Sequence, residues 1–286
     1  MSTNGLDHAQ YKSRQVQTWD GVAAAWDRWW PAIEKGFQSI SDHMISSAAI
    51  KPGHRVLDVA TGIGEPAFTA ARAVGQTGRV VATDQSPQML EIAQRRGKDL
   101  GETNVEFREM DAEQLDFPEA SFDAALCRWG LMFLPDLSAA LDNLYRLLQP
   151  GGRMVAAVWS EPAKVPMLRL AGEVVRQYID LPTPPPGAPD IFGLAGPDAL
   201  QNAFVASGFT GVTTERKVAT LELPSCDDYA NFTLDIAGPL AAAIAQESSE
   251  IQAKIRHDLA QAVGQYASAD GSISIPNETL CVSGTK

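Results

Sequence analysis

The sequence VLDVATGIGEPA at residues 56–67 decides the fold, because a short apolar run leads directly into a glycine-rich turn. The run Arg55–Ala60 predicts a buried strand, and the residues after the turn predict a helix. Gly62 and Gly64 allow a sharp backbone turn and let a ligand approach the main chain without a Cβ in the way. This order of elements predicts the first unit of a parallel sheet covered by helices.

The stretch from Lys51 to Trp159 continues this alternation of short β-branched runs with helical patterns. We expect its strands at Arg55–Ala60, Arg79–Thr83, Val105–Arg108, Phe122–Cys127 and Arg153–Trp159. Such alternation is typical of a parallel sheet with helices on both faces. The predicted fold class is therefore α/β, with a doubly wound, Rossmann-like sheet.

The helices between these strands have identifiable boundaries. Ser86 is a suitable N-cap, and Pro87 then occupies the first helical position, where its missing N–H costs nothing. A second helix carries one apolar stripe of leucines spaced four, three and four residues apart, namely Leu137, Leu141, Leu144 and Leu148. We expect Pro150–Gly152 to end that helix.

The segments outside this core differ from it in composition. Residues 1–50 predict helices with a high tryptophan content, and residues 225–265 predict alanine-rich helices. The sequence LPTPPPGAP at 181–189 predicts a stiff loop or linker. We expect three consecutive parts: an N-terminal helical lid at 1–50, a cofactor-binding core at 51–160, and remaining core strands with substrate-cap insertions at about 162–197 and 225–265 within 161–286.

The chemistry begins with an acid after the second strand. Asp84 comes 20 residues after Gly64, where a carboxylate accepts hydrogen bonds from ribose hydroxyls. The pattern Gly62-x-Gly64-x-x-Ala67 also fits a dinucleotide fingerprint, so an NAD-dependent oxidoreductase is one alternative. Glu65, Pro66 and Asp58 argue against it, because two carboxylates and a missing N–H suit a pyrophosphate poorly. They favour a phosphate-free nucleoside with an ammonium and a sulfonium.

In this succession the chain resembles the class I S-adenosylmethionine-dependent methyltransferases, especially the branch similar to the ubiquinone/menaquinone-biosynthesis and small-molecule methyltransferases. The matching segments lie within about residues 50–160, namely Val56–Gly64, Val81–Asp84 with Ser86–Met89, Met110–Ala112 through Leu115–Pro118, Ser121–Asp123 and Leu147–Gly152. The resemblance implies S-adenosyl-L-methionine as cofactor and a sheet of seven strands with the last antiparallel. Residues 212–216 and 272–282 then become the sixth and seventh strands.

The resemblance also implies roles for individual residues. Gly62, Gly64 and Asp58 would surround the methionine part, Asp84 would bind the ribose, and Asp111 with Ala112 would meet the adenine. Arg128 and Trp129 would line the methionine end. The expected cofactor-binding residues are Asp58, Ala60, Thr61, Gly62, Gly64, Asp84, Gln85, Met89, Asp111, Ala112, Arg128 and Trp129.

Structural roles stay open for several of these residues. Asp84 also fits a helix N-terminus, Asp58 an acceptor for loop amides, and Asp111 a turn. Met89 also fits a packing role. Ala60 stands where the family often has glycine, a departure that leaves only the loop geometry in question.

The acceptor side is expected to involve the N-terminal tryptophans. An aromatic ring near a sulfonium gains cation–π attraction, so Trp26 is the favoured lid residue. The candidate substrate residues are Trp26, Trp29, Trp30, Met132 and Phe133. As an alternative, Trp19, Trp26 and Trp30 share one helix face and simply pack on the core, and Met132 is a packing residue.

Methyl transfer from a sulfonium depends mainly on positioning and the exclusion of water. No residue stands out as a general base, so the catalytic residues stay unassigned. The expected acceptor is a small, largely apolar organic molecule, methylated on carbon, oxygen or nitrogen. A methyltransferase-fold binding protein without activity is the second alternative to this enzyme.

Composition limits the partners and the location. The chain has 23 Lys and Arg against 35 Asp and Glu, and the net charge of −12 disfavours nucleic acids. No segment approaches the roughly 18 consecutive apolar residues of a membrane span, and no signal peptide is visible. Three widely spaced cysteines argue against a metal site and for a reducing compartment. We expect a cytoplasmic protein, either a monomer or a homodimer.

Overall fold

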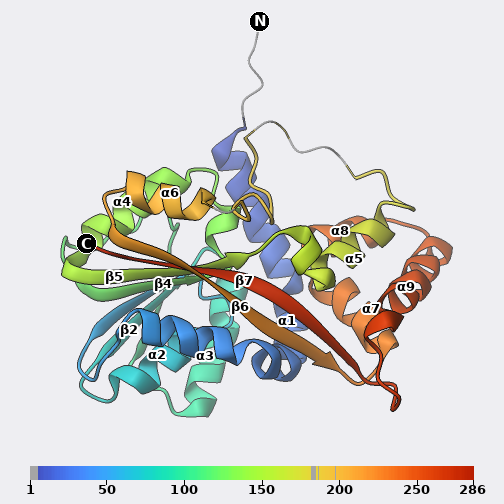
Figure 1. Ribbon diagram of the computed structural model, residues 1–286, viewed down its shortest axis with the longest axis horizontal. Helices are drawn as coiled ribbons and strands as arrows, with labels where there is room; N and C mark the ends of the chain where they lie inside the picture. Colours follow the sequence, from blue (N-terminus) through green and yellow to red (C-terminus); the bar gives the residue numbers. More distant parts are fainter. Residues whose placement is uncertain (1–5, 182–184, 186, 197) are drawn as a thin grey trace, which may run out of the picture. The chain divides into compact units, whose positions relative to one another are not determined.

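The computed structural model describes residues 6–181, 185, 187–196 and 198–286. Its sheet has seven strands in the order β3-β2-β1-β4-β5-β7-β6 (Figure 1). The strands are β1 (Arg55–Val59), β2 (Arg79–Asp84), β3 (Val105–Glu109), β4 (Phe122–Arg128), β5 (Leu148–Trp159), β6 (Thr210–Leu223) and β7 (Ile273–Thr285). Neighbours from β3 to β5 are parallel, whereas β7 pairs antiparallel with β5. The predicted fold class, with its antiparallel last strand, is confirmed.

The central strands are apolar because both faces of the sheet are covered. In β1 the residues from Val56 to Val59 are at most 1% exposed. A parallel sheet needs such continuous apolar runs, since helices pack on both of its sides. Asp58 is the exception within β1, because it places a carboxyl group with 0% exposure among apolar neighbours. An ionisable group in such a position calls for a specific reason.

Helices cover the two faces of the sheet. α2 (Ala67–Val74) and α3 (Pro87–Leu100) lie on one face, and α4 (Leu137–Leu147) and α6 (Ala199–Ala206) lie on the other (Figure 1). α3 begins as expected, with the Ser86 hydroxyl accepting a hydrogen bond from the Met89 N–H at 3.1 Å. This cap fixes the start of α3 directly after Asp84, which ends β2.

The chain divides into two compact units. The first comprises Met1–Gln38, Glu161–Ala188 and Val218–Glu278, and the second comprises Ser39–Ser160, Pro189–Lys217 and Thr279–Lys286. The first unit therefore groups residues from all three segments predicted to lie outside the core. Its helices are most of α1 (His8–Ser47) with α5 (Pro166–Val175), α7 (Cys226–Ile236), α8 (Pro239–Ile244) and α9 (Ser249–Val263). The expected roles of these segments as lid and cap stay predictions.

Several predicted boundaries differ from those observed. Residues 1–50 were expected to form several helices, but the described part forms the single helix α1. The end expected for α4 at Pro150–Gly152 is wrong, because α4 stops at Leu147 and Leu148 already pairs with Phe122 in the sheet. Strand pairing there overrides the helical spacing of the leucines.

The remaining elements complete the chain. β6 and β7 are longer than the predicted strands at 212–216 and 272–282. In the proline-rich segment, the described residues 181, 185 and 187–189 lie outside helices and strands, and 182–184 and 186 lie outside the described residues. Short 3-10 helices occur at Leu131–Phe133, Pro162–Lys164 and Gly264–Tyr266. Among the helices that the structure describes, none combines the length and apolar character needed to cross a bilayer.

Candidate functional site

The candidate site lies at the carboxyl ends of β1, β2 and β4, where the winding of the sheet changes direction. β1 pairs with β2 on one side and β4 on the other, so that Asp58 lies between Ala82 and Leu126 in the register. In open α/β sheets, ligands bind outside the carboxyl ends of the strands at such a switch point. The ends of these strands and the loops that follow them carry most of the predicted cofactor-binding residues.

The turn after β1 contains three residues with positive φ, which are Ala60 at 55°, Gly62 at 56° and Gly64 at 114°. A Cβ on Gly64 would lie 2.1 Å from the Phe68 ring, so close packing requires glycine there. A Cβ on Gly62 would have no described atom within 4 Å. Gly62 thus leaves its side of the turn open, as close approach of a ligand to the backbone requires.

Ala60 takes the left-handed conformation that glycine adopts without strain, at a cost of about 1–2 kcal/mol. Its methyl group packs against the loop after β4, because a Cβ added to Gly130 would lie 2.6 Å from the Ala60 Cβ. The alanine side chain is accommodated by a glycine on the neighbouring loop.

Asp84 joins the two loops that were predicted to hold the nucleoside. Its Oδ2 accepts a hydrogen bond from the Gly62 N–H at 2.8 Å, and its Oδ1 accepts one from the Ser86 N–H at 2.9 Å. A carboxylate offers about four acceptor positions, more than these two bonds occupy. Asp84 therefore has a structural role in the turn that is compatible with its predicted contact to ribose hydroxyls.

Asp58 is the most unusual group of the candidate site. Neither of its carboxylate oxygens makes a hydrogen bond to a described residue. Burial raises its pKa from 3.8 to about 7, although the nearby Thr61 hydroxyl, Arg128 and the Ala67 N–H lower it. The Thr61 hydroxyl lies close to Asp58 without reaching hydrogen-bonding geometry. A buried carboxyl without a partner is costly, and a bound cation would offset that cost.

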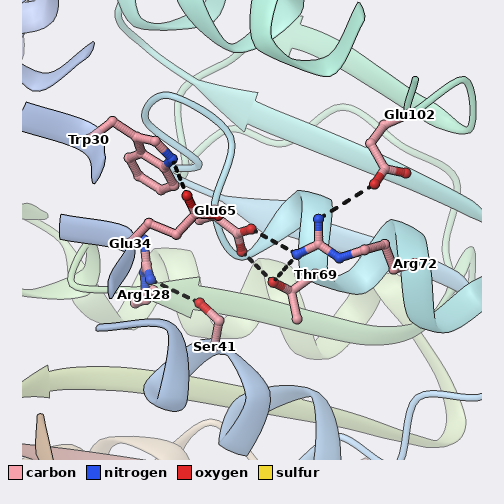
Figure 2. A network of polar contacts seen from close by, with 8 residues as sticks. All are labelled: Trp30, Glu34, Ser41, Glu65, Thr69, Arg72, Glu102 and Arg128. Carbon is pink, nitrogen blue, oxygen red and sulfur yellow. Dashed lines mark hydrogen bonds and ion pairs between the residues drawn. The ribbon is translucent and has the colours of Figure 1, made fainter. Parts of the chain in front are cut away.

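The Glu65 carboxylate is buried and has two partners on α2. Its carboxylate accepts hydrogen bonds from the Thr69 hydroxyl at 2.7 Å and from the Arg72 guanidinium at 3.3 Å, as Figure 2 shows. Arg72 also reaches Glu102 at 3.5 Å. The sequence interpretation gave Glu65 a part in repelling pyrophosphate and in serving a cationic ligand. In the structure its negative charge is instead paired along α2.

The predicted adenine and ribose contacts follow β2 and β3. Asp111 forms a turn, with its Oδ1 accepting a hydrogen bond from the Glu113 N–H at 2.9 Å. The adjacent Ala112 is buried. Gln85 is partly exposed, whereas Met89 is buried within α3. Asp111 thus has the turn role, and Met89 the packing role, that were kept as alternatives. The contacts to adenine and ribose stay predictions.

The end of β4 brings a cation and two indoles together. Trp129 has a φ of 58° and stacks on Trp159, with ring centroids 4.4 Å apart and an interplanar angle of 10°. The Arg128 guanidinium lies 4.9 Å from the Trp129 ring centroid and donates a hydrogen bond to the Ser41 hydroxyl at 2.8 Å (Figure 2). The predicted pair Arg128 and Trp129 is thus accompanied by Trp159, which sequence reasoning did not assign to the site.

Two further predicted residues follow directly on this loop. Met132 is 4% exposed and Phe133 is partly exposed, and both belong to the short 3-10 helix after Gly130. Burial agrees with the packing role that was left open for Met132. Their contact with an acceptor stays a prediction.

The N-terminal tryptophans lie in the first unit and are described within it. The Trp29 Nε1–H donates to Asp235 at 2.7 Å, and its ring meets Phe232 edge to face at 5.6 Å. Arg28 also contacts Asp235, at 2.6 Å. These interactions anchor α1 to α7 within this unit.

The other indoles of α1 differ in their partners. The Trp30 Nε1–H donates to Glu34 at 3.0 Å (Figure 2), and Trp30 is only 5% exposed. Trp26 meets Trp19 edge to face at 6.1 Å, and its buried Nε1–H has no hydrogen-bond partner among the described residues. The assignments of Trp26, Trp29 and Trp30 to lid and substrate contacts stay predictions.

Cys127 lies beside the site, yet its environment opposes reactivity. Burial raises the pKa of its thiol to about 12, and the nearby charge of Asp58 acts in the same direction. The thiol therefore stays protonated and is a weak nucleophile at neutral pH. Among the described residues, no group of three His, Cys, Asp or Glu side chains gathers in a metal-binding arrangement.

Comparison with known proteins identifies similar sequences. Residues 11–182 match the model of the ubiE/COQ5 methyltransferase family. A ubiquinone/menaquinone biosynthesis C-methyltransferase, UbiE, from Pseudoalteromonas translucida is 37% identical over 119 residues, which are 41% of this chain and 47% of that protein. The chain thus spans about half the length of this curated relative.

Solved structures share the fold at lower sequence identity. The YcgJ protein from Bacillus subtilis superposes with a TM-score of 0.55 at 20% identity, covering 87% of this chain and 98% of that one. The [4+2]-cyclase SpnF gives a TM-score of 0.53 at 18% identity, covering 94% of this chain and 96% of that one. At such identities the likeness shows the fold alone.

Proposed function

The chain belongs to the ubiE/COQ5 methyltransferase family, and from that premise we propose that it transfers a methyl group from S-adenosylmethionine to a small, largely apolar organic molecule. S-adenosylmethionine is the methyl donor of this family. The observation that carries the proposal is the 2.8 Å hydrogen bond from Gly62 to Asp84 at the switch point of the sheet. It supports a nucleoside lying over the turn, with its ribose at Asp84.

The residues around the turn have distinct parts in this proposal. Gly62 would allow the cofactor to lie against the backbone, and Asp84 would accept the ribose hydroxyls. Asp111 and Ala112 would meet the adenine, and Asp58 with Arg128 would hold the charged methionine end. These assignments rest on the resemblance and on where the residues stand in the fold.

In the proposed reaction the main task of the protein is to position the two reactants. The cofactor supplies a methyl group already activated on a sulfonium, so the protein must place the acceptor atom about 3–3.5 Å from it and exclude water. Trp129, directly after β4, and Trp159, the last residue of β5, form a stacked apolar pair that suits this exclusion. Cys127 stays protonated and Glu65 is paired with Arg72, so neither of these two groups has the features of a general base.

The choice of acceptor is assigned in this proposal to the first unit. That unit contains most of the N-terminal helix, the insertion at 225–265, and the insertion at 162–197 as far as residue 188. Because the relative is named for ubiquinone and menaquinone biosynthesis, intermediates of those two pathways are the first acceptors to test. Carbon, oxygen and nitrogen are all open as the methylated atom.

Incubation with methyl-labelled S-adenosylmethionine and these intermediates, and then with a metabolite extract, tests the proposal. We expect labelled product from the unchanged protein and from Asp142→Asn, which alters an exposed residue of α4. We expect none from Asp84→Ala. Cofactor binding without labelled product from any acceptor would favour a binding protein with this fold. Saturable binding of NADH in place of S-adenosylmethionine would overturn the proposal.

A further inference from the structure

The carboxyl group of Asp58 has no hydrogen-bond partner among the described residues. The residue is 0% exposed, and both carboxylate oxygens lie without a hydrogen bond to any described group. It stands on β1, one residue before the end of the strand and two residues before the left-handed Ala60. The carboxyl group therefore sits at the base of the turn over which the proposed nucleoside would lie.

The charged and titratable groups around Asp58 come from each neighbouring element. Arg128 at the end of β4 favours its ionised form, and Glu65 in the turn opposes it. Cys127 on β4 is uncharged at neutral pH, and its thiol feels the charges of Asp58 and of Asp84 on β2. The neutral Thr61 hydroxyl and the Ala67 N–H also favour ionisation.

Burial outweighs the neighbours that favour the ionised form of Asp58. The Arg128 guanidinium also donates a hydrogen bond to the Ser41 hydroxyl at 2.8 Å and lies 4.9 Å from the Trp129 ring centroid. The pKa of the Asp58 carboxyl is raised to about 7, with burial as the largest cause. At neutral pH the group is thus divided between its protonated and ionised forms.

We propose that, at neutral pH and below, Asp58 holds a proton in a large fraction of the ligand-free protein and releases it when a cationic centre of S-adenosylmethionine binds, so that cofactor binding is coupled to proton release. The inference rests on the proposed function. The balance is simple, since the carboxylic acid loses one proton to the solvent and the resulting carboxylate pairs with the cation. No bond other than the O–H bond is broken.

The coupling gives the affinity a defined pH dependence. Above the pKa of about 7 the free carboxyl is already ionised, so binding needs no proton release. Below that pKa, the Asp58 carboxyl must lose its proton before it can pair with the cation, so the affinity for the cofactor falls. With a bound-state pKa well below 6, we expect about tenfold weaker binding at pH 6 than at pH 8, with about 0.9 proton released at pH 6 and about 0.1 at pH 8.

Titration calorimetry of the whole protein in buffers of different ionisation enthalpy tests this coupling. S-adenosylmethionine and S-adenosylhomocysteine serve as probes, at pH 6 and at pH 8. Proton release on binding of both probes supports pairing of the Asp58 carboxylate with the ammonium, which both probes carry. Proton release with S-adenosylmethionine alone supports pairing with the sulfonium. Asp58→Asn should abolish the proton release, whereas the matched control Asp142→Asn on exposed α4 should retain it.

Two results separate the failure of this inference from that of the proposed function. Binding of both probes with equal affinity at the two pH values and no proton release would overturn the coupling alone. If neither probe binds at pH 6 or at pH 8, the proposed function is overturned. If Asp58→Asn fails to fold, infrared difference spectra of the unchanged protein replace it. Loss of a protonated-carboxyl band on ligand addition would support the coupling, and an unaltered band would refute it.

Discussion

The backbone N–H of Gly62 donates a 2.8 Å hydrogen bond to the Asp84 carboxylate. This contact joins the turn after β1 to the end of β2, two places 22 residues apart in the chain. A second bond, from the Ser86 N–H at 2.9 Å, ties the same carboxylate to the start of α3. One side chain therefore shapes the loop and also presents the oxygens expected to meet the ribose.

Replacing Asp84 by alanine should abolish measurable S-adenosylmethionine binding. The change removes the predicted ribose acceptor and releases the Gly62 N–H, which costs about 1–3 kcal/mol of stability. Calorimetry measures the binding, and circular dichroism checks that the fold is retained. Unchanged affinity in a folded variant would refute the ribose assignment.

Gly62→Ala and Gly64→Ala should have different effects. Both positions have positive φ, but an added Cβ has no described atom within 4 Å at Gly62 and lies 2.1 Å from Phe68 at Gly64. We expect Gly62→Ala to lose about 1–2 kcal/mol of stability and most of its cofactor affinity. Gly64→Ala should lose about 3 kcal/mol or more. Denaturant unfolding and calorimetry measure both, and equal affinity in Gly62→Ala and the parent would count against close approach of the cofactor.

Ala60→Gly should leave the protein as stable as before or more stable, by up to about 1 kcal/mol. Glycine relieves the strain of the left-handed conformation at a φ of 55°, while its greater freedom in the unfolded chain offsets part of this gain. Denaturant unfolding measures the difference. A loss of more than about 1 kcal/mol would show that the contact of the Ala60 methyl group with the Gly130 loop outweighs the strain.

Asp58→Asn should change how stability depends on pH in the absence of cofactor. The folded-state pKa is raised from 3.8 to about 7, so the protonated carboxyl contributes stability at low pH that is lost as the pH rises through 7. From this group we expect the free energy of unfolding of the parent to fall from about pH 4 to pH 7 and to change little above pH 7. The asparagine variant should show a flatter profile and be more stable at pH 8 by about 1–3 kcal/mol. Parallel profiles for the two proteins would contradict the buried, unpaired state of Asp58.

Trp159→Leu should weaken cofactor binding through Trp129. The two rings stack at 4.4 Å, and such a pair contributes about 0.5–1.5 kcal/mol beyond the area it buries. We expect a loss of the near-ultraviolet dichroism of the pair and a severalfold lower affinity for S-adenosylmethionine. Trp159→Phe, which keeps a stacked ring, is the control and should retain most of that affinity. Equal affinity in both variants and the parent would restrict Trp159 to a packing role.

Local patterns accounted for the order of elements and for the main features of the turn. The apolar runs, Ser86 with Pro87, and the glycines before α2 act over a few residues, so their consequences can be read from the chain. Helical spacing alone misled at Leu148, because that residue pairs with Phe122 on a distant strand. The pairing of Glu65 with Arg72 was also not predicted, because it depends on the direction of the Glu65 side chain.

The sequence by itself determined the α/β class, the family resemblance, and the identity of Gly62, Gly64 and Asp84 as a set, because these depend on backbone conformation and short-range periodicity. Only the tertiary structure decided that Asp58 is buried without a partner, that Arg128 bonds to Ser41, and that Trp159 stacks on Trp129. The physical reason is that burial and contact between distant residues arise from sheet register and packing, which no local pattern specifies.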